Sequence, residues 1–423
     1  MRVLIITLVY PPEHAAAGVM VAELAAELTR AGHMVTVLAG FPSHPAGHLF
    51  KGWKARLFSK EQTSDSFTLI RCIHSFVSRY GVMGKIWYHF TFAVSSFCAG
   101  LLGGSFDVLV LQSTPVFCGP SAICLAKIRK AKTFYWIHDV HPESAIHAGL
   151  LKPGILSSMM KAADSWVCRQ SDVVATITDD MRDVILERAL PAGRVILQRH
   201  WVDEERIRPL PRENAWRKRN GISPTGFVVL HAGTIGYISG ASVIVEAARL
   251  LKDHGEIQFL FVGEGPLKAD LQRKAEEYRL TNTRFLPFQP EEDLNLMQAT
   301  GDVGLVTLKS LSAATSIPSK MYGYTSAGRA VIASVNPASS VAGLIEEGGF
   351  GWVVPPEDPG ALADAILYAA SHDHECQCRG ERAREFFVRE FGRNAVTSKF
   401  RRELEALWGR RTRTQGKMKT VPT

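Results

Sequence analysis

A histidine and a carboxylate stand side by side where a predicted strand ends. The apolar run Thr133–Ile137 passes directly into His138 and Asp139. A histidine can take up or release a proton near neutral pH, and the adjacent carboxylate could orient its ring or tune its pKa. A histidine at the end of a strand can also cap neighbouring carbonyl groups. Position alone does not decide between catalysis and capping.

A glycine turn in the second half of the chain could hold a phosphate. The predicted strand Phe227–His231 is followed by Gly233, Thr234 and Gly236. Glycine lets the backbone approach a diphosphate closely, and a helix expected from Ser239 would direct its positive end to the same place. A tight turn without a ligand is the alternative interpretation.

A lysine lies in a second, proline-fixed turn. Pro318, Ser319 and Lys320 precede an expected helix over Met321–Ala327. An ammonium group at this point could neutralise a departing phosphate. A solvent-exposed lysine is the alternative, and only the glycine turn singles this lysine out.

The loop after the first predicted strand, Val3–Val9, is a third candidate. It contains Glu13, His14 and Gly18 and opens the first helix. Its backbone N–H groups could cradle a phosphate or a sugar hydroxyl. A dinucleotide-binding G-x-G-x-x-G motif needs three glycines and this loop has one, so no nicotinamide cofactor is expected. A plain strand-to-helix turn remains the alternative.

No metal site is expected. His372, His374, Cys376 and Cys378 alternate along a stretch predicted to be extended. At a rise of ~3.3 Å per residue, the end members lie too far apart to share one ion. The sequence also lacks a D-x-D motif, which argues against a divalent metal held by carboxylates.

Short apolar strands alternate with amphipathic helices along the chain, which is typical of parallel α/β sheets. At 423 residues the chain exceeds the size of a single core, so two Rossmann-like domains are expected. Ligands bind beyond the carboxyl ends of such strands, where the turns above lie. The predicted strands are residues 3–9, 35–38, 68–72, 108–111, 133–137, 173–177, 195–197, 227–231, 258–262, 284–286, 303–307, 330–334 and 352–354.

The linker Trp201–Ser223 is rich in Arg, Glu, Asn and Pro, and we predict a hinge there. We place an N-terminal domain at residues 1–205 and a C-terminal domain at 206–385. The closing stretch Glu381–Trp408 is predicted to be helical, and residues 409–423 are expected to form a disordered basic tail because they show no periodicity.

The net charge of +8 is compatible with nucleic acid, an anionic membrane surface or a phosphorylated small molecule as partner. The chain has no RNA-binding signature and no zinc-finger spacing, which argues against nucleic acid. Its seven cysteines are odd in number and are interpreted as thiols of a reducing compartment. Met1 and Arg2 lead straight into a strand, so we expect no signal peptide and a cytoplasmic location.

The segment Ile86–Gly104 is long and apolar, and Arg79 and Lys85 precede it. Its histidine, serines and glycines argue against a spanning helix. A buried helix of an α/β domain and an interfacial membrane contact are the two remaining interpretations.

Taken in order, these motifs resemble those of the family 4 retaining glycosyltransferases of the GT-B fold, especially bacterial exopolysaccharide and colanic-acid-type enzymes. The resemblance reaches to about Trp408 and includes Pro11-Pro12-Glu13, His138-Asp139, Gly263-Glu264-Gly265-Pro266 and Pro318-Ser319-Lys320. It implies two Rossmann-like domains facing a central cleft, with a helix at 386–408 crossing back to the N-terminal domain. It also implies sugar transfer, with retention of configuration and without a metal or other cofactor, from a nucleotide-diphosphate sugar to a polyprenyl-diphosphate-linked acceptor at the inner face of the cell membrane.

The resemblance also assigns roles to residues. The catalytic positions would be His138 and Lys320, and Glu13, His14, Gly18 and Asp139 would lie on the acceptor side. Many members carry basic residues where this chain has Tyr237, Ile238 and Ser239, and glutamates where it has Thr315 and Gly323, which leaves Lys320 as the candidate cation. The implied donor-binding residues are Gly233, Thr234, Gly236, Glu264, Thr315, Pro318 and Ser319.

Two other functions remain open at this point. A nucleotide-sugar 2-epimerase shares the fold, but such enzymes usually need additional carboxylates that cannot be placed here. A non-catalytic partner subunit with a degenerate donor site would explain the missing basic residues and glutamates.

Overall fold

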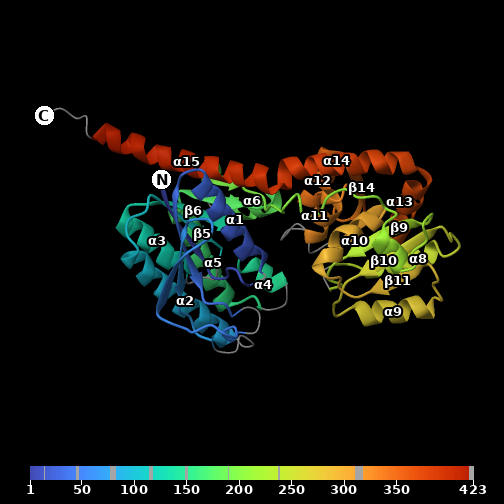
Figure 1. The fold of residues 1–423 in the computed structure, drawn as a ribbon, viewed down its shortest axis with the longest axis horizontal. Coiled ribbons are helices and arrows are strands. Elements are labelled where there is room, and N and C mark those ends of the chain that lie inside the picture. Colours follow the sequence, from blue (N-terminus) through green and yellow to red (C-terminus); the bar gives the residue numbers. More distant parts are fainter. Residues whose placement is uncertain are drawn as a thin grey trace. The chain divides into compact units, whose positions relative to one another are not determined.

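The computed structural model describes residues 1–13, 15–43, 47–76, 82–113, 118–147, 151–188, 190–236, 239–309 and 318–418. The chain divides into two compact units: unit 1 comprises Met1–His200 and Val396–Thr423, and unit 2 comprises Trp201–Ala395. Each unit has one largely parallel sheet covered by helices (Figure 1). The predicted class of two α/β domains is confirmed.

Unit 1 is built on an eight-stranded sheet in the order β3-β4-β2-β1-β5-β6-β7-β8. All neighbouring strands are parallel except β3 and β4. The inner strands are continuous apolar runs, as a sheet covered on both faces requires. The strands are β1 (Arg2–Thr7), β2 (Met34–Gly40), β3 (Phe58–Gln62), β4 (Thr68–Cys72), β5 (Val108–Gln112), β6 (Lys132–Ile137), β7 (Val173–Thr176) and β8 (Val195–Leu197).

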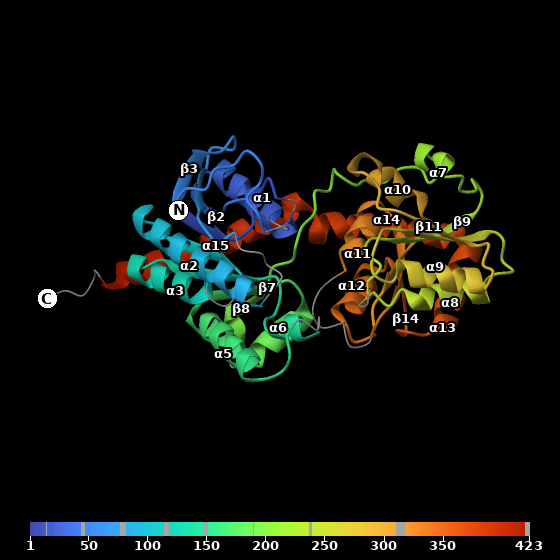
Figure 2. The same cartoon turned by 90° about the horizontal axis from the view of Figure 1, so that it is seen from below.

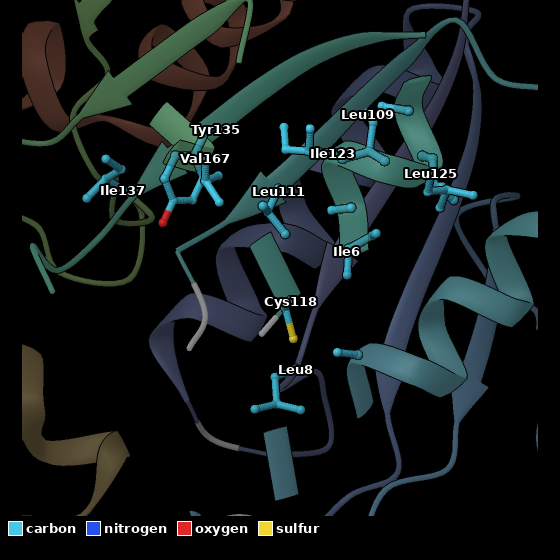
Figure 3. Close-up of a cluster of buried hydrophobic side chains, with 14 of the residues drawn as sticks. Ile6, Leu8, Leu109, Leu111, Cys118, Ile123, Leu125, Tyr135, Ile137 and Val167 are labelled. Atoms are coloured by element: carbon cyan, nitrogen blue, oxygen red, sulfur yellow. The ribbon is translucent and has the colours of Figure 1, made fainter. Parts of the chain in front are cut away.

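Three helices of unit 1, α2, α3 and α5, lie side by side (Figure 2). In the core beneath them, Leu111 of β5 and Tyr135 of β6 gather with Ile123 of α3 and Val167 of α5 (Figure 3). The helices of this unit are α1 (Ala16–Arg30), α2 (Val82–Leu102), α3 (Cys118–Arg129), α4 (Glu143–His147), α5 (Ile155–Gln170), α6 (Asp179–Leu186), the 3-10 turn Ala192–Arg194, and α15 (Arg393–Met418) from Val396 onward.

Unit 2 has a six-stranded, fully parallel sheet in the order β11-β10-β9-β12-β13-β14, with a hydrophobic core on each face. Its strands are β9 (Phe227–Ala232), β10 (Ile257–Val262), β11 (Thr283–Leu286), β12 (Val303–Thr307), β13 (Ala330–Ser334) and β14 (Gly351–Val354). Its helices are α7 (Ala215–Arg219), α8 (Ser242–Leu250), α9 (Lys268–Glu277), the 3-10 turn Glu291–Asp293, α10 (Leu294–Thr300), α11 (Ser319–Ser326), α12 (Ser340–Gly348), α13 (Pro359–Ser371) and α14 (Asp373–Phe391).

The division between the units falls after His200, whereas the linker composition had suggested residue 205. Val202 donates its N–H to Phe391 O at 3.0 Å, and Glu204 Oε2 accepts the N–H of Arg393 at 2.7 Å. These bonds tie the start of the linker to the end of α14 and the beginning of α15, within unit 2.

The end of the chain also differs from the prediction. The single closing helix expected over 381–408 is two helices, α14 and α15, which meet at Gly392. From Val396 the chain belongs to unit 1 again, where His33 Nε2 lies 2.9 Å from Glu405 Oε1 of α15. Helix α15 continues to Met418, through ten residues assigned beforehand to a disordered tail starting at 409.

The apolar segment at 86–104 forms most of helix α2, which packs one face on the core of unit 1 as the first interpretation predicts. Tyr88 and Phe92 are buried in the core, whereas Trp87, Phe90 and Val94 remain exposed. Arg79 lies outside the described residues, as does the side chain of Lys85. Within the described ranges, no helix combines the length and apolar character needed to cross a bilayer.

Candidate active site

The glycine turn of unit 2 follows the carboxyl end of β9. The N–H groups of Gly233 and Ile235 donate to Val262 O at 2.8 Å and Glu264 O at 2.9 Å, which holds this turn against the one that follows β10. Within the described residues, the alternate N–H groups of Thr234 and Gly236 have no acceptor. Gly233 has a φ of +126°, which only glycine adopts without strain. The turn thus offers two backbone donors on one side, suited to an anion.

Lys320 lies beside this turn. It belongs to the first helical turn of α11, which begins at Ser319 and not at Met321 as predicted. A Cβ on Gly233 would lie 3.9 Å from its Cε. Its Nζ lies 3.1 Å from Nε2 of His231, the penultimate residue of β9. Lysine, glycine turn and helix N-terminus therefore meet at one corner of the sheet.

The electrostatics of this corner are unusual because the partly buried ammonium group of Lys320 has no counter-charge among the described residues. Burial lowers the pKa of Lys320 to about 7. Burial and the adjacent ammonium hold the pKa of His231 well below its ordinary value, so the ring is neutral and accepts the lysine's hydrogen bond. No carboxylate pairs with Lys320 in the part of the chain that the structure describes.

The other residues predicted to bind the donor sugar nucleotide differ in how exposed they are and in whether they already have a partner. Pro318 is the residue before α11, and no side chain caps this helix. Ser319 is exposed at its start. Glu264 is half-exposed and its carboxylate pairs with Lys268 at 2.7 Å. Thr315 lies outside the described residues.

The helix after the glycine turn begins later than predicted. α8 starts at Ser242, three residues beyond Ser239. Ser239 instead closes the turn, with its hydroxyl donating to Gly236 O at 2.7 Å and its carbonyl accepting the hydroxyl of Thr307.

In unit 1, His138 follows β6 and is paired with a second histidine. Its Nδ1 lies 2.7 Å from Nε2 of His200, and its backbone N–H donates to Ser113 Oγ at 2.8 Å. The ring packs on Trp136 with 4.2 Å between centroids. Burial lowers the pKa of His138 well below its usual value, with a further contribution from His200, and burial lowers the pKa of His200 to about 4. Both rings are therefore neutral at neutral pH.

The predicted partnership of His138 with Asp139 is wrong. The ring of His138 is oriented by His200, and Asp139 is an exposed residue whose backbone N–H faces Ser113 Oγ at 3.4 Å. Successive residues at a strand end point in different directions, so adjacency in sequence did not bring these side chains together.

The loop after β1 is more rigidly built than an open binding loop. Glu13 is buried, and its carboxylate accepts the N–H groups of Tyr10 at 3.0 Å and Ser43 at 2.8 Å. These two bonds fix the loop. A Cβ on Gly18 would lie 2.8 Å from Val9 O, so this glycine allows α1 to approach the loop. His14 lies outside the described residues.

A buried ionic network holds the segment that follows His138. Arg188 donates to His141 O at 2.9 Å and to Glu143 Oε2 at 2.8 Å, and it also binds Asp164. Asp164 in turn accepts the hydroxyl of Tyr135 at 2.6 Å. This network anchors the loop that starts at the candidate histidine.

Sequence reasoning missed both partner histidines. His200 follows β8, two strands from β6, and His231 is the penultimate residue of β9. Polar residues at the carboxyl ends of parallel strands gather at one edge of the sheet. This rule singled out His138 and Gly233, and it applies equally to His200 and His231.

His374, Cys376 and Cys378 lie in helix α14 and His372 lies just before it, so the stretch is not extended as predicted. His374 and Cys378 are one turn apart in α14, with 3.8 Å between Nδ1 and Sγ, and Cys376 is buried. A search of the described residues finds no group of three or more His, Cys, Asp or Glu that could hold a metal ion.

Comparisons with known proteins agree with this architecture. Residues 15–199 match the glycosyl transferase 4-like domain, and residues 212–386 match the glycosyl transferases of group 1. The chain is 28% identical to the probable glycosyltransferase WbjE of Pseudomonas aeruginosa over 63% of this chain and 64% of that protein, just under two thirds of its length. It is 26% identical to the putative colanic acid biosynthesis glycosyl transferase WcaI of Escherichia coli over 87% of this chain and 92% of that protein.

A solved structure extends the comparison to the whole fold. HepE from Anabaena, determined in complex with UDP, superposes with a TM-score of 0.70 at 14% identity and covers 96% of this chain and 100% of its own. At that identity the likeness concerns the fold alone. With both units matched by family models and the fold matched by HepE, the chain belongs to the group 1 glycosyltransferases of the GT-B fold.

Proposed function

We propose that this protein transfers a sugar from a nucleotide-diphosphate sugar to a lipid-linked saccharide in the synthesis of a cell-surface polysaccharide, with retention of configuration and without a metal. The observation that carries the proposal is Lys320, a partly buried cation with a neutral histidine as its hydrogen-bond partner. A buried charge is costly unless an opposite charge compensates it. A diphosphate would supply that charge.

The proposed chemistry follows from the groups at each strand edge. Lys320 and the free N–H groups of Thr234 and Gly236 would stabilise the charge that develops on the leaving diphosphate. His138 would position the donor sugar. The acceptor hydroxyl would attack the anomeric carbon from the face that the diphosphate leaves, which retains configuration. The chain has no D-x-D motif, and Lys320 would take over the charge neutralisation that a metal performs in other enzymes.

The names of the comparison proteins support the donor and the pathway. HepE is described in complex with UDP and with UDP-glucose. WcaI is named for colanic acid biosynthesis. We therefore expect a uridine-diphosphate sugar as the first donor to test, and a polyprenyl-diphosphate-linked saccharide as acceptor.

We also propose that unit 1 docks on the inner face of the cell membrane, where its acceptor would lie. Large apolar side chains are exposed along α2, α3 and α5, and on α2 and α5 they recur at helical spacing. Lys127 and Arg129 end α3 on the same layer, and Lys127 Nζ lies 5.7 Å from the ring centre of Trp166. The exposed apolar residues are Trp87, Phe90, Val94, Leu102, Ile128, Ile155, Leu156, Met159 and Trp166.

The transferase activity is tested by product analysis with a panel of nucleotide sugars and polyprenyl-diphosphate-linked acceptors. We expect a glycosylated lipid, a free nucleoside diphosphate and an unchanged anomeric configuration by NMR, with activity retained after treatment with EDTA. An epimerised sugar nucleotide, or no product with any donor, would reject the proposal.

Membrane docking is tested by flotation with phosphatidylglycerol vesicles. The double variant Ile155→Asp/Met159→Asp should lose binding, whereas Phe288→Asp, which changes an exposed apolar residue of unit 2, should retain it. Binding should weaken as salt is raised if basic residues contribute. Equal flotation of the two variants would reject this surface.

A further inference from the structure

The hydrogen bond between His138 and His200 joins two neutral rings and does not involve Asp139. The two rings lie 4.6 Å apart between centroids, and both pack on Trp136, which fixes their planes. Nδ1 of His138 is hydrogen-bonded to Nε2 of His200 at 2.7 Å. Nε2 of His138 is buried and has no hydrogen-bond partner among the described residues.

A hydrogen bond between two neutral imidazoles determines the tautomer of both. Each neutral ring carries one N–H, so one of the two bonded nitrogens donates and the other accepts. The choice made at His200 Nε2 therefore decides whether Nε2 of His138 is a donor or an acceptor. Neither ring has a carboxylate partner in the described part of the chain that could override this choice.

We propose that His200 is a positioning residue, which orients the ring of His138 and fixes its tautomer so that Nε2 meets one hydroxyl of the transferred sugar. The inference rests on the proposed function for the identity of the ligand. The geometry supports it independently, because a buried polar nitrogen without a protein partner is rare and calls for a ligand or a water molecule. A sugar hydroxyl can complement Nε2 in either tautomer, since it both donates and accepts.

Two substitutions separate the hydrogen bond from the space that the ring fills. His200→Phe keeps an aromatic ring against Trp136 but has no nitrogen. His200→Gln has a side-chain amide that can donate to or accept from Nδ1 of His138. His254→Phe serves as the control, because His254 is an exposed residue of unit 2 that pairs with Glu256.

We expect His200→Phe to lower the turnover of sugar transfer by roughly 10²-fold, as misplacement of a positioned group does. The turnover of His200→Gln should remain within about tenfold of that of the wild type, because its amide can keep the hydrogen bond to His138 that His200→Phe loses. The affinity for the nucleoside diphosphate alone should not change, because its proposed site is the corner around Lys320. In nitrogen-15 NMR spectra of the ligand-free protein, the Nδ1 resonance of His138 should shift in His200→Phe and return towards the wild-type position in His200→Gln.

Wild-type turnover in His200→Phe, or an equal loss in the Gln and Phe variants, would overturn the inference. An unchanged Nδ1 resonance in His200→Phe would overturn it without reference to activity. If the wild-type protein moved no sugar from any donor, the proposed function would fall together with the sugar contact, while the NMR comparison would still decide whether His200 orients His138.

Discussion

A basic side chain lies near the carboxyl edge of the sheet in each unit, Arg188 in unit 1 and the partly buried Lys320 in unit 2, and the two are neutralised to very different degrees. In unit 1, Arg188 binds two carboxylates, those of Asp164 and Glu143. Burial works to lower the pKa of Arg188, but these carboxylates outweigh it and the pKa is raised. In unit 2, the described residues offer Lys320 only the neutral ring of His231, and burial lowers its pKa to about 7.

The difference separates a cation with a structural partner from one that we propose binds a ligand. The carboxylates of Arg188 leave no charge for a ligand to neutralise, and its hydrogen bonds anchor the loop after His138. Among the described residues, Lys320 has no counter-charge and the N–H groups of Thr234 and Gly236 have no acceptor, and a diphosphate would satisfy both. Perturbed pKa values mark candidate functional sites when, as here, the partner is missing.

The largest expected effect is on the stability of unit 1. Arg188→Leu removes the cation that pairs with the buried Asp164, whereas Glu143 keeps Lys161, and it should lower the free energy of unfolding by about 3–5 kcal/mol. Lys320→Met removes an uncompensated buried charge and should leave stability unchanged or raise it. Urea denaturation of both variants makes the comparison, with Arg273→Leu, an exposed residue paired on α9, as the control for loss of a surface arginine. Equal stability losses at positions 188 and 320 would contradict the distinction between the two cations.

The next effect is on catalysis. Lys320→Met should lower the turnover of sugar transfer by about 10²–10³, the usual loss for one electrostatic stabiliser of a leaving group. His138→Ala should impair transfer as well, with the fold retained. Lys274→Met changes a half-exposed lysine of α9 in the same unit and should have no effect. Near wild-type turnover in both the Lys320 and His138 variants would remove these residues from the active site.

A smaller effect is expected on donor binding from the glycine turn. Gly233→Val places a branched side chain at a φ of +126° in the space next to Lys320, so it should weaken binding of a nucleoside diphosphate by more than about tenfold. Gly255→Val is the matched control, because nothing lies within 4 Å of a Cβ added there. Calorimetry with UDP measures both, and unchanged affinity in Gly233→Val would place the diphosphate elsewhere.

The smallest effect is a pH dependence. With a pKa of about 7, the free Lys320 loses its proton above neutrality, and an anionic ligand favours the protonated form. The affinity for a nucleoside diphosphate should therefore fall by up to about tenfold between pH 7 and pH 8. Lys320→Arg stays charged and should show a flat profile from pH 7 to 9. Parallel profiles would mean that Lys320 does not titrate in this range.

The same pKa fixes the sign of a stability change in the ligand-free protein. The unfolded chain holds the lysine proton up to the ordinary pKa of 10.5, whereas the folded chain releases it near 7. Between these values the unfolded state binds more protons, so the contribution of Lys320 to the free energy of unfolding rises with pH. It is least favourable below pH 7, where the folded protein buries the charge.

Most of the sheet could be predicted because its strands are continuous buried apolar runs, as in β6 and β9. The strand that was missed, β3, has the sequence Phe-Ser-Lys-Glu-Gln and lies at an exposed edge. It is formed through antiparallel pairing with β4, which its own sequence does not indicate.

Residues of the candidate site could be predicted where the sequence of a single turn identifies them. They could not be predicted where two side chains from distant strands pair with each other. Gly233 and Lys320 could be placed from turns alone. His200 could not be matched to His138 because 62 residues separate them and the register of β6, β7 and β8 had to be known. The resemblance assigned Glu13 to the acceptor side, but its bond to the N–H of Ser43, 30 residues away, could not be predicted because it depends on how the two loops pack.

The central claim, that Lys320 is a cation held for the diphosphate of the donor, is tested most directly by a crystal structure of the complex with UDP. A phosphate oxygen should lie roughly 2.7–3 Å from Lys320 Nζ and within hydrogen-bond distance of the N–H groups of Thr234 and Gly236. A diphosphate bound away from Lys320, with the lysine still paired to His231 alone, would contradict the account.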